Sequence, residues 1–114
     1  MKNALMLLLI AGLLGCGAVP GGEKLQAIAQ AGRVTLATSK GGELPADRCP
    51  PAIASLDPRR VYIASEGLYI VTSTFFVEER GLFIPRASHF VPQVGADPSY
   101  DSIGEGVFSY RIKG

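Results

Sequence analysis

The sequence has no tryptophan, one histidine, two cysteines and almost no net charge. Because Lys and Arg outnumber Asp and Glu by only 11 to 10, no strong positive field attracts polyanions, and we expect no nucleic-acid partner. One histidine and no glycine-rich phosphate loop leave few groups for cofactor or metal binding, so we expect neither. A chain of 114 residues has room for one domain.

Long apolar stretches are also scarce, and the one that stands out lies at the N-terminus. Lys2 precedes residues 4–14, an uncharged run interrupted by Gly12. As a helix this run would span about 16 Å at about 1.5 Å per residue, against a hydrocarbon core of about 30 Å. A basic residue followed by a short apolar run is typical of a secretory signal peptide.

The apolar run ends in Leu13-Leu14-Gly15-Cys16, which resembles the lipobox of bacterial lipoproteins. The resemblance covers residues 1–16. It implies cleavage between Gly15 and Cys16, a diacylglyceryl group on the Cys16 thiol and a further acyl chain, such as palmitate, on the new amine. Two or three acyl chains give stable membrane anchoring, whereas one gives only marginal binding. The alternative is an ordinary cleaved signal with Cys16 near the junction.

The residue after the cysteine carries sorting information in Gram-negative members of this family, where Asp favours the inner membrane. Gly17 occupies that position here. The resemblance therefore implies an outer-membrane protein that faces the periplasm if the host is Gram-negative.

The chain then divides into a signal peptide at residues 1–15, a lipidated cysteine with a flexible tether at 16–22, and one domain at 23–114. Pro20, Gly21 and Gly22 disfavour regular structure in the tether.

The domain is predicted to be mainly β, a small antiparallel sheet or meander of about five strands with one short N-terminal helix. Apolar spacing predicts the helix over residues 23–31, ended by Gly32, and alternation predicts a strand over 33–40.

The second half of the chain holds all nine Phe and Tyr residues. Strands are predicted over 61–64, 68–77, 82–84 and 106–113, with turns at 65–67 and 78–81. The proline-containing segments 43–57 and 89–103 are predicted as long loops, and loops on a rigid sheet are candidate recognition surfaces.

Cys49 has no partner in its own chain if Cys16 carries a lipid. We therefore treat Cys49 as a candidate free thiol and favour a buried small hydrophobe. A disulfide-linked dimer through Cys49 is the next alternative, and Cys16 could pair with Cys49 if lipidation failed.

Catalytic signals are weak. Ser88 and His89 are adjacent, so on a strand they would point to opposite faces, and a hydrolase would also need a carboxylate such as Asp97 or Asp101. Carboxylates at positions 97, 101 and 105 do not have the spacing of a calcium loop, so no metal site is predicted.

The sequence favours a membrane-anchored envelope lipoprotein with a non-catalytic binding, assembly or inhibitor role toward a protein or cell-wall partner. The alternative is a small envelope hydrolase that uses Ser88 and His89 with a loop carboxylate.

Overall fold

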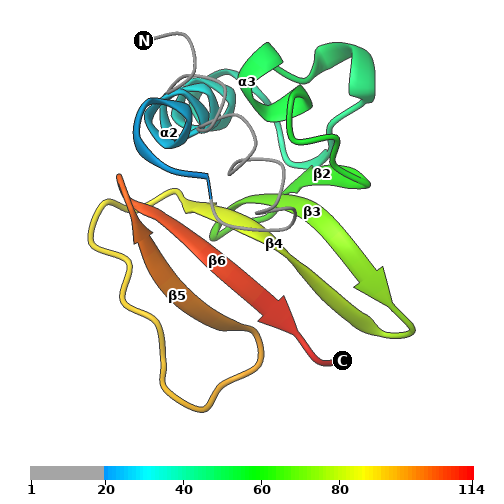
Figure 1. Ribbon diagram of the computed structural model, residues 1–114, viewed down its shortest axis with the longest axis vertical. Coiled ribbons are helices and arrows are strands. Elements are labelled where there is room, and N and C mark those ends of the chain that lie inside the picture. The colour runs from blue at the N-terminus through cyan, green and yellow to red at the C-terminus, as the bar shows by residue number, and fades with distance from the viewer. Residues whose placement is uncertain (1–19) are drawn as a thin grey trace, which may run out of the picture.

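The computed structural model describes residues 20–114, so the predicted signal peptide, the cleavage site after Gly15 and the lipid site at Cys16 lie outside the described residues. Six antiparallel strands form one sheet in the order β1-β2-β3-β4-β6-β5, with helix α2 on one face (Figure 1). The elements are α2 Gly22–Thr38, β1 Gly42–Glu43, η1 Ala46–Arg48, α3 Pro51–Ala54, β2 Arg60–Ile63, β3 Gly67–Phe75, β4 Glu78–Pro85, β5 Ser99–Gly104 and β6 Val107–Ile112. The prediction of a mainly β, antiparallel fold is confirmed, with six strands where about five were expected.

Helix α2 is longer than predicted, and the strand predicted over residues 33–40 is wrong. The helix begins at Gly22 and runs for 17 residues, passing through Gly32 instead of ending there. Its buried side follows helical spacing: Leu25, Ile28, Ala29, Gly32, Thr35 and Leu36. A Cβ on Gly32 would lie 2.1 Å from Cδ1 of Ile84 in β4. Gly32 therefore allows close helix–sheet packing, which outweighs the low helix propensity of glycine.

The segment 43–57, predicted as a loop, contains several short elements. Glu43 ends the two-residue edge strand β1, and the 3₁₀ turn η1 and the one-turn helix α3 follow. Proline is favourable at the first position of a helix, where Pro51 stands. Ile53 of α3 is fully buried, so this segment is held against the helix-covered side of the sheet.

Strands β3 and β4 form a long hairpin. The turn predicted at residues 78–81 is wrong, because these residues belong to β4 and the chain reverses at Phe76 and Val77. In the register, Val71 pairs with Gly81 beside an irregularity in β3. A Cβ on Gly81 would lie 1.9 Å from the carbonyl oxygen of Ile70. Gly81 is thus required by close backbone approach and not by a turn.

The loop predicted over residues 89–103 is shorter than expected. Ser99–Gly104 form β5, an edge strand that pairs with β6, while residues 86–98 remain without helix or strand. The C-terminal strand predicted over 106–113 is present as β6.

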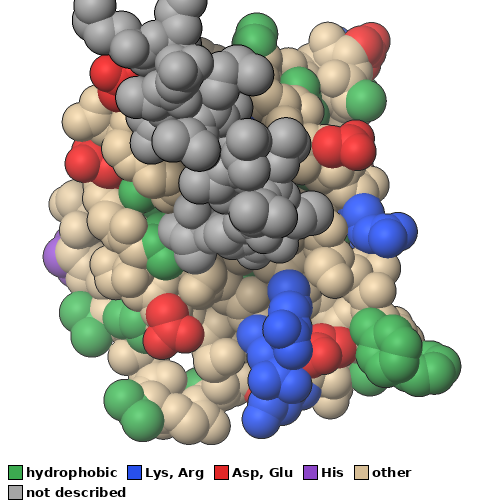
Figure 2. Space-filling view, in the orientation of Figure 1, with side chains coloured by type: hydrophobic (Ala, Val, Ile, Leu, Met, Phe, Trp, Pro, Cys, Tyr) green, Lys and Arg blue, Asp and Glu red, His purple; other side chains and the backbone are tan. Residues whose placement is uncertain are grey.

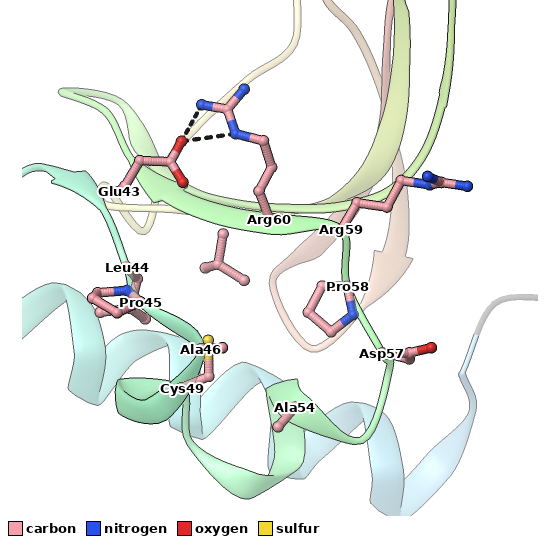
Figure 3. A pocket seen from close by; sticks show the side chains of 11 residues that line it. Glu43, Leu44, Pro45, Ala46, Cys49, Ala54, Asp57, Pro58, Arg59 and Arg60 are labelled. Carbon is pink, nitrogen blue, oxygen red and sulfur yellow. Dashed lines mark hydrogen bonds and ion pairs between the residues drawn. The ribbon is translucent and has the colours of Figure 1, made fainter.

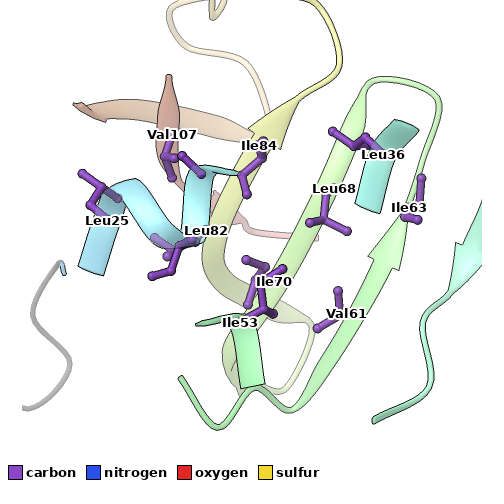
Figure 4. Packing of buried hydrophobic residues seen from close by; sticks show 12 residues of the cluster. Leu25, Leu36, Ile53, Val61, Ile63, Leu68, Ile70, Leu82, Ile84 and Val107 are labelled. Carbon is purple, nitrogen blue, oxygen red and sulfur yellow. The ribbon is translucent and has the colours of Figure 1, made fainter. Parts of the chain in front are cut away.

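The two faces of the sheet carry different cores. An aliphatic cluster lies between the sheet and the helices (Figure 4). Its buried members are Leu25, Ile28, Ala29, Leu36, Ile53, Val61, Ile63, Leu68, Ile70, Leu82, Ile84 and Val107. The opposite face carries an aromatic cluster with Tyr69, Phe83, Phe108 and Tyr110 buried and Tyr62, Ala64, Phe90, Tyr100 and Ile112 packed around them. Period-two alternation along the strands separates the two sets.

Candidate functional site

Ser88 and His89 lie in an exposed turn directly after β4. The carboxylate of Asp97 is engaged elsewhere, accepting hydrogen bonds from the backbone N–H groups of Lys113 at 2.8 Å and Gly114 at 3.2 Å. The structure therefore does not join Ser88 and His89 to Asp97 as a catalytic set.

The other acidic residues in this region are also separate. Asp101 lies exposed on β5, and Glu105 has a positive φ of 56° in the β5–β6 turn, where its carbonyl oxygen accepts a hydrogen bond from Arg33. Among the described residues, no group of three or more His, Cys, Asp or Glu side chains could hold a metal ion.

Cys49 lines a shallow pocket of about 320 Å³ between η1, α3 and strand β2 (Figure 3). The thiol is half-buried against the aliphatic cluster and forms no disulfide within residues 20–114. Burial, with a contribution from Asp47, raises the pKa of the Cys49 thiol. Glu43 and Arg60 close one side of the pocket through an ion pair, with Nε donating to Oε1 at 2.8 Å. A raised pKa keeps the Cys49 thiol protonated, so Cys49 is not activated as a nucleophile.

The aromatic cluster has a polar margin formed by two glutamates. The hydroxyls of Tyr62 and Tyr110 donate to one oxygen of Glu79 at 2.8 and 2.7 Å. The hydroxyl of Tyr69 donates to Glu66 at 2.7 Å, which lowers the pKa of that carboxyl. Burial above all raises the phenol pKa of Tyr69 and Tyr110 well beyond the ordinary range.

These tyrosines have a structural role in the core of the domain. Tyr69 and Tyr110 are 2% and 4% exposed, and their rings meet edge to face with centroids 4.9 Å apart. No polar side-chain atom buried within the described part of the chain lacks a hydrogen-bond partner. The cluster is therefore a satisfied core rather than an open binding site.

Residues 86–98, which we call the pinned loop, cross the edge of the aromatic cluster and are fixed at three points. Arg86 donates to the carbonyl oxygens of Ser65 at 3.2 Å, Ala64 at 3.3 Å and Leu36 at 3.4 Å. In the middle, Phe90 packs against Phe83, Tyr100 and Phe108 with centroid separations of 5.1, 5.1 and 5.2 Å. At the end, Asp97 accepts its two backbone hydrogen bonds.

Between these attachment points the pinned loop displays apolar side chains. Val91 is 81% exposed and Val94 is fully exposed. Most of this loop lies within residues 89–103, one of the two segments that the sequence predicted as candidate recognition surfaces, but the sequence did not reveal how Arg86, Phe90 and Asp97 would hold it.

A second exposed apolar surface, which we call the hairpin tip, consists of Phe75, Phe76 and Val77. These side chains are 68%, 90% and 74% exposed, and the two rings lie 4.5 Å apart. In the orientation of Figure 1 the β3–β4 turn lies at the lower right, where Figure 2 shows a projecting hydrophobic patch. The sequence missed this surface because its residues were assigned to a core strand or its end.

The backbone at the hairpin tip is unfavourable for an aromatic residue. Phe76 has a φ of 54°, as the first position of a two-residue hairpin turn requires. Glycine or asparagine adopts this region readily, whereas other residues lose about 1–2 kcal/mol there. A phenylalanine at this position is costly to the fold, which indicates that the exposed ring has another role.

A polar groove of about 880 Å³ runs from the base of this hairpin to the start of α2. Its lining includes Lys24, Arg80 and Arg111. Arg111 donates to Glu78 at 2.7 Å and Arg80 donates to it at 3.3 Å, and together they lower the pKa of the Glu78 carboxyl.

No protein-family model matches the chain, and comparison with curated proteins and with solved structures gives no significant match. No helix within residues 20–114 is long and apolar enough to cross a bilayer.

Proposed function

We propose that the protein is a lipid-anchored cell-envelope protein whose domain has a non-catalytic role and binds a protein or cell-wall partner through the pinned loop. The lipobox-like sequence ending at Cys16 supports the anchor. In a Gram-negative host, Gly17 supports an outer-membrane location facing the periplasm.

The observation that carries the binding role is the exposure of Val91 and Val94 on a loop that is fixed at both ends and in the middle. Fixing a loop before binding reduces the conformational entropy lost on association. Exposed valines on such a loop supply apolar area to a partner without reorganisation of the sheet.

The anchor is tested by mass spectrometry of the N-terminal peptide from native envelopes, with and without inhibition of lipoprotein signal processing. The expected peptide begins at acylated Cys16, and inhibition leaves the uncut precursor. Normal maturation under inhibition contradicts the anchor.

The binding surface is tested by affinity capture from native envelopes with a Val91→Ser/Val94→Ser variant. Val34→Ser is the matched control, because Val34 is 55% exposed and belongs to α2 and not to the pinned loop. A partner held by the pinned loop is recovered with the wild type and the control and lost with the double variant. Recovery of the chain alone, or of the same partner with all three proteins, contradicts the proposal.

A further inference from the structure

The start of helix α2 and the base of the β3–β4 hairpin lie along one surface. Pro20 and Lys24 line the polar groove together with Ser73 and Arg80. Ser73 and Arg80 also line the adjoining hollow, of which Phe75 forms another side. The first described residue of the chain therefore shares this groove with residues of the hairpin that carries the hairpin tip.

The chain between the lipid site and this groove is short. Four residue steps separate Cys16 from Pro20, a span of at most about 14 Å at about 3.6 Å per residue. The strand from Ser73 to Phe76 covers about 10 Å at about 3.3 Å per residue. A bilayer that holds Cys16 therefore lies no more than about 14 Å from Pro20, and the hairpin tip extends about 10 Å from Ser73 in the same groove.

The composition of this surface suits a membrane interface. Two aromatic rings and a valine are exposed at the tip, and Arg80 lines the hollow beside Phe75. Arg80 and Arg111 both contact Glu78, yet their side chains remain 56% and 45% exposed. Figure 2 shows Lys and Arg side chains near the projecting hydrophobic patch, with an acidic side chain between them. Aromatic side chains enter the boundary between headgroups and acyl chains, while basic side chains contact lipid phosphates.

We propose that Phe75, Phe76 and Val77 insert into the interface of the same bilayer that holds the Cys16 anchor. The domain is then attached at two points, the lipid and the hairpin tip, and so has a defined orientation on the membrane. The inference rests on the proposed anchor. It assigns the exposed ring of Phe76 a lipid partner, and it leaves the pinned loop for a partner outside the membrane.

The absence of tryptophan permits a direct test with the full lipidated chain reconstituted in phosphatidylcholine and phosphatidylglycerol vesicles. Phe76→Trp places a single indole at the hairpin tip, and Val94→Trp places one in the pinned loop as the matched control. We expect the emission of Phe76→Trp to shift to shorter wavelength and to be quenched by lipids brominated near the headgroup. The Val94→Trp emission stays at the wavelength of a water-exposed indole. Phe75→Trp is a second reporter if Phe76→Trp does not fold.

The possible outcomes separate the hairpin from the anchor. A lipidated Phe76→Trp or Phe75→Trp chain that is not quenched overturns the insertion and leaves the anchor intact. An N-terminal peptide that is not acylated overturns the anchor. Quenching of the unacylated chain on vesicles would in that case still support the contact between the hairpin tip and the bilayer. Equal quenching of the control overturns the defined orientation. An indole that is water-exposed on vesicles but shielded in native envelopes indicates a protein occupant and also overturns the proposal.

Discussion

Removing one hydroxyl group, by Tyr110→Phe, tests the polar margin of the aromatic cluster. The ring is retained, and with it the edge-to-face contact with Tyr69. What is lost is the 2.7 Å hydrogen bond to Glu79. Hydrogen bonds to charged groups contribute about 1.5–3 kcal/mol, and the lower end applies because Glu79 is half-buried and keeps its bond from Tyr62. We expect Tyr110→Phe to lower the free energy of unfolding by about 1.5 kcal/mol at pH 7.

The same substitution has a different effect in alkali. Burial first, and then the hydrogen bond to Glu79, raise the phenol pKa of Tyr110. The contribution of the Tyr110 hydroxyl to the free energy of unfolding is fully present below the unfolded-state pKa of about 10. It decreases above that pH because the unfolded tyrosine ionises while the folded one keeps its proton. At pH 11 the decrease is about 1.4 kcal/mol for one tyrosine. The wild type and Tyr110→Phe are therefore expected to unfold with almost equal free energies at pH 11.

Urea unfolding followed by circular dichroism at pH 7 and pH 11 measures this change. Ile53→Val is the matched control, because it removes one methylene from a fully buried side chain and should cost about 0.5–1.5 kcal/mol at either pH. A Tyr110→Phe difference that remains as large at pH 11 as at pH 7 would refute the assignment of a proton retained by Tyr110.

Three further experiments test other parts of the structure. Gly81→Ala should lower the free energy of unfolding by about 3 kcal/mol, because the new Cβ meets backbone atoms. Gly32→Ala should change it by less than about 1 kcal/mol, because the Ile84 side chain can move and helix propensity improves. Thermal unfolding of both variants measures the two effects, and equal losses of stability would contradict this assignment. Phe76→Asn should raise the free energy of unfolding by about 0.5–1 kcal/mol by relieving the positive φ, and a lower melting temperature would show that the ring serves the fold. Cys49 should react with a thiol reagent more slowly in the native protein than in urea because burial raises its pKa, and equal rates would contradict a half-buried thiol.

The strand-rich half of the fold was predictable because its buried residues alternate along the chain. Val61, Tyr62 and Ile63 already separate the two faces of the sheet in this way. The helix was underestimated because the alternation of Val34 and Leu36 resembles a strand, although Leu25, Ile28 and Leu36 also fit one helical face.

Glycine was the main source of error, because its local and tertiary roles give the same sequence signal. Gly32 and Gly81 look like a helix end and a turn, yet each is placed by the close approach of a distant residue, Ile84 in one case and Ile70 in the other. Only the packed structure reveals those approaches. The hairpin tip was missed for a related reason, since nothing local in Phe75 or Phe76 distinguishes an exposed aromatic residue from a buried one.

The aromatic cluster also gives the protein an unusual optical property. All four tyrosines, at positions 62, 69, 100 and 110, belong to this one cluster, and no tryptophan adds a second chromophore. Ultraviolet absorption at tyrosine wavelengths therefore reports on a single face of the sheet. A ligand or membrane that disturbs the aromatic face changes this absorption, whereas a rearrangement confined to the aliphatic side leaves it almost unchanged.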